Sequence, residues 1–215
     1  MIARDIQALE MDPLGPLNGK SFCTTISPWV ITLDALAPFK VAGPERKPEV
    51  ELAPYMQRQP GFKTYDFELS AEYLPCKSNG SNGHSDLGDA EASTVCKTRF
   101  SSLYWTLLDL IAQQTINGCP LNVGDLLATG TISGRTLESR GCLMESPSGV
   151  EYGTNPDDSK KVLQSLGDGD RLTLIGRAGD GVGFGNCVGT VQKAIVDSNE
   201  LFTLQSLKLC ERLET

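Results

Sequence analysis

Apolar and polar residues alternate most strictly over residues 65–73. Apolar side chains occupy every second position, with acidic or small polar side chains between them: Tyr65, Phe67, Leu69, Ala71 and Tyr73 against Asp66, Glu68, Ser70 and Glu72. Successive side chains of a strand point to opposite faces of its sheet, so this period of two predicts a strand with one buried face. The opposite face is acidic, and its simplest interpretation is a solvated sheet surface.

A different period runs through residues 98–117. Apolar residues recur there at steps of three and four, as on the buried side of a helix: Phe100, Leu103, Tyr104, Leu107, Leu108, Ile111 and Ile116. Asn117 and Gly118, followed by Pro120, form a strong helix stop. The pattern predicts one long helix over this range.

Short apolar stretches elsewhere predict further strands, at residues 29–33, 126–128, 142–145 and 172–175. Residues 179–189 are rich in glycine and contain a Gly-x-Gly-x-x-Gly spacing. A strand follows this spacing rather than a helix, which excludes the dinucleotide-binding motif. We expect these glycines to form kinks and a bulge in a curved sheet.

One long helix among many β segments predicts an α+β fold with a dominant β core, in a single domain over residues 1–215. Residues 38–61 hold five prolines and are expected to form a surface connection. Residues 77–93 have low complexity, which predicts a flexible loop. The only histidine, His84, lies in this loop. A catalytic base must be held within hydrogen-bond distance of the proton it removes, so we interpret His84 as an exposed residue without a catalytic role.

The composition narrows the range of partners and compartments. The chain has 215 residues and a net charge of −8, which argues against nucleic acid and anionic membranes as partners. Its seven cysteines are irregularly spaced and include no Cys-x-x-Cys pair, so a disulfide framework or a zinc site is not expected. Reduced thiols, the lack of a signal peptide and short apolar runs together predict a cytoplasmic protein.

Charged and polar residues suited to binding or catalysis are concentrated near the start of the chain. Arg4 and Gln7 are three residues apart, which puts both on one side of a helical turn, and Lys20 and Thr24 follow in a glycine-punctuated segment. The residues alone leave two interpretations open: a solvated helix end with a turn, or one wall of a site for an oxyanion or a metal. Lysine and arginine are donors suited to a carboxylate or a developing oxyanion.

Two residues later in the chain, Thr131 and Glu145, are further candidates for such a site. Thr131 lies between two glycines in Gly-Thr-Ile-Ser-Gly, where hydroxyl and backbone N–H groups can approach an anionic ligand. Glu145 ends an apolar stretch that we expect to be a strand, where it would be partly buried. A buried carboxylate needs a partner or takes up a proton, whereas a strand-end surface residue needs neither.

A series of motifs in a fixed order resembles the fumarylacetoacetase family. The motifs are Ala-Arg-Asp-Ile-Gln, Leu-Gly-Pro-x-x-Gly-Lys-Ser-Phe, Ser-Pro-Trp-Val, Tyr-Trp-Thr-x-Leu, Asn-Gly-Cys-x-Leu-x-x-Gly-Asp-Leu-Leu-Ala-x-Gly-Thr-Ile-Ser-Gly and Gly-Phe-Gly-x-Cys. They run from residue 3 to about residue 195 and correspond to the C-terminal half of that family's catalytic domain. The resemblance implies a mixed β-sandwich roll.

The resemblance also implies a reaction. The family hydrolyses a carbon–carbon bond of 4-fumarylacetoacetate to fumarate and acetoacetate, the last step of tyrosine and phenylalanine catabolism, and works as a homodimer. A divalent metal, Mg²⁺ or Ca²⁺, binds the diketone oxygens, and a Glu–His pair activates water. A small β-diketo acid is therefore the implied partner.

Carried over by motif, the family's roles fall on seven residues. Arg4, Gln7 and Lys20 would stabilise the developing oxyanion. Arg4, Gln7, Met11 and Thr131 would contact the substrate. Lys20 and Thr24 would lie at the metal, and Glu145 would orient the base or water.

The chain also departs from the family pattern. The family's catalytic histidine and most of its metal carboxylates belong to a half that is missing here, so we expect a truncated chain with little activity alone. Met11 replaces a substrate-binding tyrosine, and Cys23 replaces a glycine. Two alternatives stay open: another β-diketone or acylpyruvate hydrolase of the superfamily, and a non-catalytic remnant or binding module.

Overall fold

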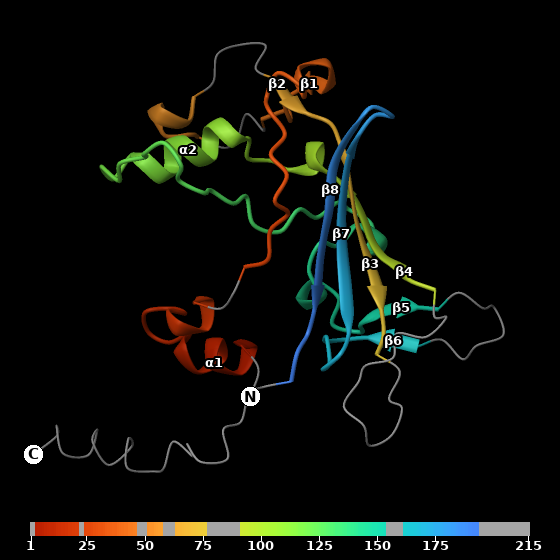
Figure 1. The fold of residues 1–215 in the computed structure, drawn as a ribbon. Coiled ribbons are helices and arrows are strands. Elements are labelled where there is room, and N and C mark those ends of the chain that lie inside the picture. Colours follow the sequence, from red (N-terminus) through yellow and green to blue (C-terminus); the bar gives the residue numbers. More distant parts are fainter. Residues whose placement is uncertain are drawn as a thin grey trace, which may run out of the picture.

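The fold is built on a four-stranded antiparallel sheet in the order β4-β3-β7-β8, which Figure 1 shows nearly edge-on. Its strands are β3 (Glu68–Leu74), β4 (Ser93–Arg99), β7 (Arg171–Ala178) and β8 (Val182–Thr190). The computed structural model describes residues 3–21, 24–46, 51–57, 63–76, 91–153 and 161–193. Two small antiparallel pairs accompany the sheet: β1 (Lys40–Ala42) with β2 (Lys63–Tyr65), and β5 (Val150–Tyr152) with β6 (Lys161–Leu163).

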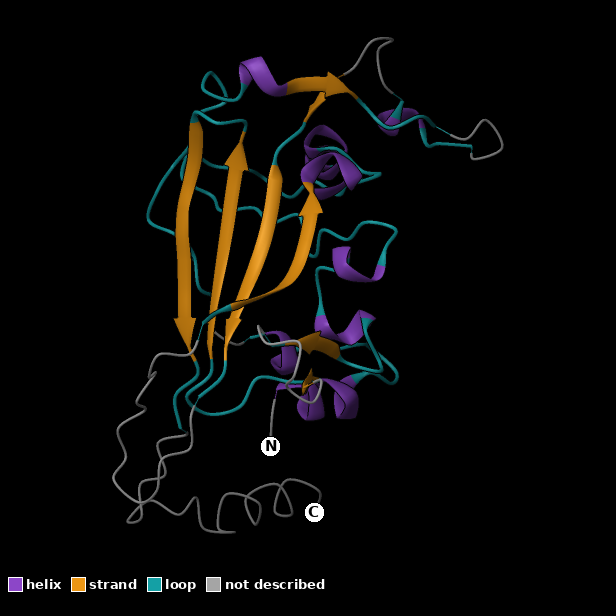
Figure 2. Cartoon of the chain, turned by 90° about the vertical axis from the view of Figure 1, so that its right-hand side faces the viewer, coloured by secondary structure: helices purple, strands orange, loops and turns teal. Residues whose placement is uncertain are grey.

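The two described α-helices, and the loops that carry Ser27 and Thr131, lie on one side of this sheet, and we call this side its covered face. The two α-helices are α1 (Ala3–Glu10) and α2 (Leu107–Thr115), and they lie on the same side in Figure 1. Figure 2 looks onto the opposite face, where no described helix crosses the strands. Six 3₁₀ turns complete the described elements: η1 (Asn18–Lys20), η2 (Ala37–Phe39), η3 (Pro54–Met56), η4 (Phe100–Ser102), η5 (Leu137–Ser139) and η6 (Leu143–Glu145). The predicted α+β fold with a dominant β content is thereby confirmed.

Two apolar clusters hold the covered face of the sheet. In the first, the Phe67 ring stacks on Phe100 with centroids 4.5 Å apart and lies 4.8 Å from the Phe184 ring, above the fully buried Ala178. The second cluster forms around Tyr73 and Leu163. The clusters lie toward opposite ends of β3, and the positions between them carry smaller side chains.

The buried carboxylate of Asp170 fixes one end of the sheet. It is 8% exposed and accepts hydrogen bonds from the Tyr73 hydroxyl at 2.9 Å, the Cys76 N–H at 2.9 Å and the Gly167 N–H at 2.8 Å. Burial and the neighbouring Asp170 charge raise the pKa of Tyr73 far above its ordinary value, so its hydroxyl remains a donor. One side chain thus joins the end of β3 to the turn before β7.

The alternation at residues 65–73 is confirmed over β3, but the predicted strand starts too early. β3 begins at Glu68, and Asp66 lies in a break after β2. The Asp66 carboxylate pairs with Arg99 at 2.7 Å, which holds the pKa of Asp66 below its usual range. Glu68 pairs with Lys97 at 3.3 Å. The acidic face of the prediction is therefore a face of mixed charge.

The prediction of a helix over residues 98–117 is wrong in its first half. β4 continues to Arg99, η4 follows, and α2 begins only after Thr106. A capping box sets this start: the Thr106 N–H donates to Asp109 at 2.7 Å, and the Asp109 N–H donates to Thr106 at 3.4 Å. The stop signal at Asn117–Gly118 is confirmed, because α2 ends at Thr115.

The Asp109 carboxylate also ties α2 to a distant segment. Arg46 donates to it at 2.8 Å, and the guanidinium lies 4.7 Å from the Tyr104 ring centroid and 4.5 Å from that of Trp105. Asp109 is only 3% exposed, so this charge pair is shielded from water. It anchors the connection after β1 to the start of α2.

Three predicted strands are absent from the described chain. Residues 29–33 and 126–128 have no ladder partner, and residues 143–145 form η6. The segment around Trp29 instead runs along β8 through side-chain contacts: Ser27 donates to the Phe184 carbonyl at 3.3 Å, and the Trp29 indole lies against Gly185. Apolar composition predicted these strands, but here the apolar side chains remain largely exposed.

The C-terminal strands agree with the sequence. The prediction at 172–175 is confirmed within β7, and the glycine-rich stretch forms the β7–β8 turn and most of β8, with a register shift between Ile175 and Arg177. Residues 77–90 of the predicted loop, with His84, lie outside the described residues. β4 already begins at Ser93.

Two further findings concern the chemistry of the described residues. None of their helices combines the length and apolar character needed to cross a membrane. Five of the cysteines lie in this part of the chain, and none of them forms a disulfide within the described residues: Cys76, Cys96, Cys119, Cys142 and Cys187.

Replacing the buried carboxylate should destabilise the sheet. We expect Asp170→Ala to lower the free energy of unfolding by about 3 kcal/mol, because three donors lose their acceptor in a water-poor site. The measurement is urea unfolding followed by circular dichroism. Asp168→Ala, at an exposed position of the same turn, is the matched control and should change stability little. Equal effects of the two substitutions would contradict this role of Asp170.

Candidate active site

The first candidate group lies on α1 and the turn that follows it. The Glu10 carboxylate, at the end of α1, accepts three backbone hydrogen bonds: from the Leu17 N–H at 2.9 Å, the Asn18 N–H at 3.1 Å and the Gly19 N–H at 2.8 Å. These bonds, led by that from Gly19, hold the pKa of Glu10 below its usual range. Glu10 therefore fastens η1 to α1.

Gly19 allows η1 to lie in close contact with α1. A Cβ at this position would lie 2.7 Å from the Gln7 Cα and 2.8 Å from the Gln7 nitrogen, so only glycine fits. Lys20 follows directly, and its side chain is exposed at the end of η1. The backbone of Gln7 thus lies against the residue before Lys20, and Arg4 lies one helical turn before Gln7. Sequence reasoning expected these residues to lie together, and the structure brings their backbones together.

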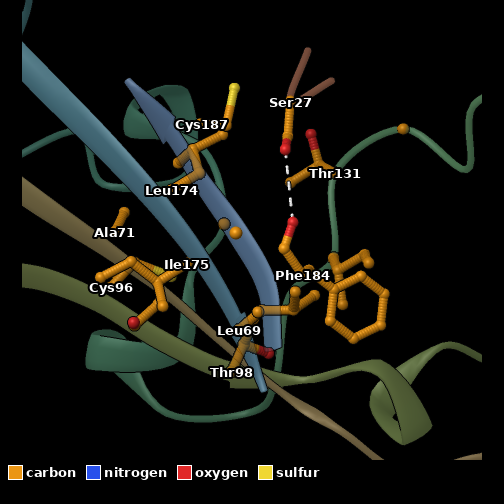
Figure 3. Close-up of a pocket in the computed structure, with 16 residues that line it drawn as sticks. Ser27, Leu69, Ala71, Cys96, Thr98, Thr131, Leu174, Ile175, Phe184 and Cys187 are labelled. Atoms are coloured by element: carbon orange, nitrogen blue, oxygen red, sulfur yellow. Dashed lines mark hydrogen bonds between the residues drawn. The ribbon is translucent and has the colours of Figure 1, made fainter. Parts of the chain in front are cut away.

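The second candidate group surrounds a cavity of about 330 Å³ on the covered face of the sheet (Figure 3). Two rows of cross-strand neighbours form its floor. Leu69 pairs with Thr98 and Gly176 in one row, and Ala71 pairs with Cys96 and Leu174 in the other, where Leu174 pairs in turn with Cys187. The Phe184 ring lies to one side of it, and Ser27 and Thr131 form the wall opposite Ala71 and Cys96.

A short relay joins Thr131 to Glu145. The Ser133 hydroxyl donates to the Glu145 carboxylate and accepts the Gly141 N–H at 3.1 Å. Gly141 in turn lies against Ile132 and the Thr131 side chain, where a Cβ would not fit. Glu145 thereby supports the loop that carries Thr131, although no contact joins the two residues directly.

The surroundings of Glu145 differ from the prediction. It was expected to be partly buried at the end of a strand, but it is exposed and lies at the end of η6. The reason is local, because residues 143–145 close a 3₁₀ turn in which the Glu145 N–H donates to the Cys142 carbonyl at 3.0 Å. Its charge still reaches the cavity: burial, and next the Glu145 charge, raise the pKa of the Cys96 thiol.

The structure does not bring all predicted site residues to one place. Thr131 lines the cavity, and Glu145 stands behind its wall, whereas Gln7 and Lys20 belong to the α1–η1 unit. Met11 is 55% exposed just after α1, and Thr24 is exposed. The Thr25 carbonyl lies at the cavity, where it accepts a hydrogen bond from the thiol of the lining residue Cys187 at 3.5 Å.

The described residues do not fit a divalent metal. Mg²⁺ and Ca²⁺ require several oxygen ligands, mostly carboxylates. Lys20 presents an ammonium group that has no free electron pair, and Thr24 presents one hydroxyl. Among the residues that the structure describes, no group of three or more His, Cys, Asp or Glu side chains could hold a metal ion. We therefore derive no reaction step through a metal from these residues.

Comparison with known proteins identifies the family. The family model described as "Fumarylacetoacetate (FAA) hydrolase C-terminal" matches residues 1–192. The chain belongs to this family. The similar proteins include fumarylacetoacetases of Bos taurus, 42% identical over 200 residues, and of Oryza sativa subsp. japonica, 42% identical over 197 residues. The human fumarylacetoacetase is 41% identical over 201 residues.

These alignments cover most of this chain but less than half of each relative. They include 90% of this chain and 43% of the Bos taurus protein, and 91% of this chain and 44% of the human protein. The chain thus spans less than half the length of the fumarylacetoacetases it matches. The sequence resemblance to the family is confirmed, and the roles of single residues stay predictions.

The sequence patterns did not indicate that Glu10, Gly19 and Gly141 support the candidate groups. The signal for Glu10 was present, because a carboxylate at the end of a short helix precedes a turn with Gly15 and Pro16, which returns the chain to the helix. The turn N–H groups at positions 17–19 then need acceptors. The tight fits of both glycines depend on three-dimensional neighbours and have no local signal.

The lowered pKa of Glu10 predicts how the α1–η1 unit responds to acid. A carboxyl group whose pKa is lower in the folded state stabilises that state above its unfolded pKa and loses this effect as the pH falls through the folded pKa. We expect η1 to stay fastened at neutral pH and to loosen in acid. The Gly19 amide proton, followed by NMR, should titrate with a midpoint below the ordinary glutamate value.

The variant Glu10→Gln is the control for that titration. It keeps the size of the side chain but removes the titrating charge, so the acid transition of the Gly19 amide should disappear. A transition that persists unchanged in this variant would contradict the assignment to Glu10.

A second prediction tests the position of Glu145. Glu145→Gln removes one cause of the raised Cys96 pKa, so the thiolate fraction should increase and Cys96 should react faster with iodoacetamide at pH 8. Mass spectrometry of the Cys96 peptide measures the rate. Glu138→Gln, a nearby exposed carboxylate that does not contribute to this pKa, is the control and should leave the rate unchanged.

Proposed function

We propose that this chain carries part of the active site of a fumarylacetoacetase, which hydrolyses a carbon–carbon bond of 4-fumarylacetoacetate to fumarate and acetoacetate. The observation that carries the proposal is the family match over residues 1–192, within which lie all seven residues of the predicted site. The names of the similar proteins of Bos taurus and Homo sapiens support it.

The reaction has an electrostatic requirement that the α1–η1 unit suits. Water adds to the carbonyl carbon on the fumaryl side, and the carbon–carbon bond then breaks with its electron pair moving to the acetoacetate fragment, which takes up a proton. Negative charge develops on an oxygen in the first step and on the leaving fragment in the second. Arg4, Gln7 and Lys20 supply two cations and an amide donor to stabilise these charges.

Rigid placement makes such donors effective, because a preorganised donor needs no reorientation during the reaction. The three bonds to Glu10 and the close contact of Gly19 with Gln7 provide this rigidity for Lys20. We assign Thr131 to the substrate carboxylate and Glu145 to the orientation of the attacking water or its base. Ser133 would hold the Glu145 carboxylate in position.

The remaining parts of the proposal come from the family resemblance. We propose Mg²⁺ or Ca²⁺ as the metal, with ligands other than the described residues, a homodimer as the working assembly, and the cytoplasm as the compartment. The five described cysteines, which form no disulfide with one another, agree with a reducing compartment. Met11 in place of the expected tyrosine favours a second candidate, hydrolysis of a related acylpyruvate, because a substrate-binding hydroxyl is lost.

A chimera tests the role of this chain within a full-length relative, where the part of the relatives that the chain does not cover is supplied. The matched 200 residues of the Bos taurus fumarylacetoacetase would be replaced by the aligned part of this chain, and the loss of fumarylacetoacetate absorbance followed with Mg²⁺ present. We expect turnover by the chimera and little turnover by the chain alone. Lys20→Met should lower kcat by about 10²–10³-fold, the effect of losing one oxyanion donor.

Lys40→Met, at an exposed position of β1, is the matched control and should leave turnover unchanged. A folded chimera without turnover, or one that tolerates Lys20→Met, would contradict the proposal. An acylpyruvate offered to the same chimera tests the second candidate: Met11→Tyr should shift the preference toward fumarylacetoacetate if Met11 sets it.

A further inference from the structure

β4 is an outermost strand of the four-stranded sheet, with β3 as its neighbour (Figure 1). A second cavity, of about 510 Å³, is lined by four consecutive residues of this strand, from Thr94 to Lys97. Consecutive side chains of a strand point to opposite faces, so a cavity on one face would touch only every second residue. A cavity that touches all four lies along the edge of β4, and we call it the edge groove.

The hydrogen-bond pattern shows which backbone groups of β4 point toward the edge groove. The Phe100 N–H donates to the Phe67 carbonyl at 2.9 Å, and the register continues without a shift from there to Cys96. In an antiparallel pair, every second pair of opposed residues is hydrogen-bonded. Thr98 and Cys96 therefore bond to β3, and the N–H and carbonyl of Lys97 point outward. No described residue donates a backbone hydrogen bond to them or accepts one from that side.

The side of the edge groove away from β4 has a defined wall. It consists of η5 with Arg140, and of a turn in which the Gly149 N–H donates to the Ser146 carbonyl at 2.7 Å. The Arg140 guanidinium donates to the Glu145 carbonyl, which ties η5 to η6. The edge of β4 thus lies in a walled groove with room for one more extended segment.

The lining of the edge groove defines what kind of segment suits it. Its charged side chains are balanced, two cations against two carboxylates: Lys97, Arg140, Glu138 and Glu151. A charged segment would gain no net attraction there and would lose hydration, so the lining favours an uncharged one. Leu137 and Val162 also line the groove and are 68% and 48% exposed, which favours apolar side chains at some of its positions.

We propose that β4 accepts a further antiparallel strand in the edge groove, from an extended and uncharged segment of another polypeptide. The backbone of this segment exchanges two hydrogen bonds with the N–H and carbonyl of Lys97. An unpaired strand edge is a template for such pairing, and backbone hydrogen bonds supply the affinity when an extended peptide adds a strand to a sheet. The proposal does not depend on the hydrolase activity.

A second copy of this chain suits the edge groove less well. Antiparallel pairing of β4 with its own copy, about a two-fold axis beside Lys97, would place two Lys97 side chains directly opposite each other. Like charges in that position are destabilising. A single extended segment also needs less room beside η5 than a second folded sheet. The occupant we propose is therefore a peptide strand and not the β4 edge of a copy.

A short acetylated peptide of alternating threonine and valine residues tests the proposal on the full chain. Its residue opposite Lys97 shares the face of the Lys97 side chain, which pairs with Glu68, so threonine suits this position. Hydrogen exchange of the backbone amides, followed by NMR, reports the pairing. We expect the Lys97 amide to exchange rapidly in the chain alone and slowly with the peptide bound. The Cys96 and Thr98 amides should exchange slowly in both.

Two N-methylated peptides isolate the backbone hydrogen bonds. N-methylation of the threonines removes the donors that point to β4 and should weaken binding by roughly fivefold for each hydrogen bond lost. N-methylation of the valines, whose N–H groups point away from β4, is the matched control and should change binding little. Equal binding of the two methylated peptides would overturn the proposal.

Variants of Lys97 test the same bond from the side of the protein, with the peptide-induced shift of the Val95 amide as the measure of binding. Lys97→Pro removes the outward N–H, which the pairing with β3 does not use, so thermal unfolding should show a folded chain. Its peptide binding should be weaker by roughly fivefold or more. Lys97→Ala keeps the N–H and removes the charge, and it should bind the peptide like the parent chain.

The exchange rate of the Lys97 amide also separates the other occupants. Slow exchange in the chain alone at every protein concentration would mean that a segment of the same chain already pairs with β4. Slow exchange that appears only as the protein concentration rises would mean a second copy. Either result, or a Lys97 amide that stays rapid with the peptide present, would overturn the proposal.

Discussion

The register of the sheet β4-β3-β7-β8 is the constraint on which both the core and the cavity depend. Pairing of Leu69 with Thr98 and Gly176, and of Ala71 with Cys96 and Leu174, decides which side chains share the covered face. A shift by one residue would move every one of them to the other face. Because β3 is paired on both sides, the register of one strand fixes those of its two neighbours.

Along this face the size of the side chains decides where the core is solid and where it is open. Phe67 and Tyr73 build clusters at the two ends of β3, whereas Ala71 leaves a gap between them. Gly176 allows the Phe184 ring to lie directly over the strand, where a Cβ would come within 3.1 Å of it. The loop of Thr131 then forms the wall of the cavity over this gap in the packing. Packing and site geometry therefore have the same origin.

Much of this could be predicted from the sequence where the pattern is local. The period of two gave the correct faces of β3, and the stop at Asn117–Gly118 marked the end of α2. The start of the helix was missed because the apolar spacing of Phe100 and Leu103 also suits a strand end and a 3₁₀ turn. The decisive signal was polar: Thr106 and Asp109 form a capping box, which overrides the apolar period.

The motif order predicts a set of site residues, whose roles stay predictions, but it does not predict how they are arranged. Motif order identified Gln7, Lys20, Thr131 and Glu145, yet nothing local indicated that Thr131 and Glu145 share a relay through Ser133 while Lys20 is fastened by Glu10. Both links depend on hydrogen bonds across turns whose shape is set by glycines. Tertiary neighbours, rather than propensities, decide such links.

The contact of residues 25–29 with β8 has a consequence for the order of folding. The Ser27 hydroxyl meets a carbonyl 157 residues away, and Thr25 meets Cys187 over 162 residues. Closing so long a loop is entropically costly, and it is rewarded only once the β7–β8 hairpin presents its edge. The segment of residues 25–29 therefore reaches its place beside β8 late in folding, after the β7–β8 hairpin has formed.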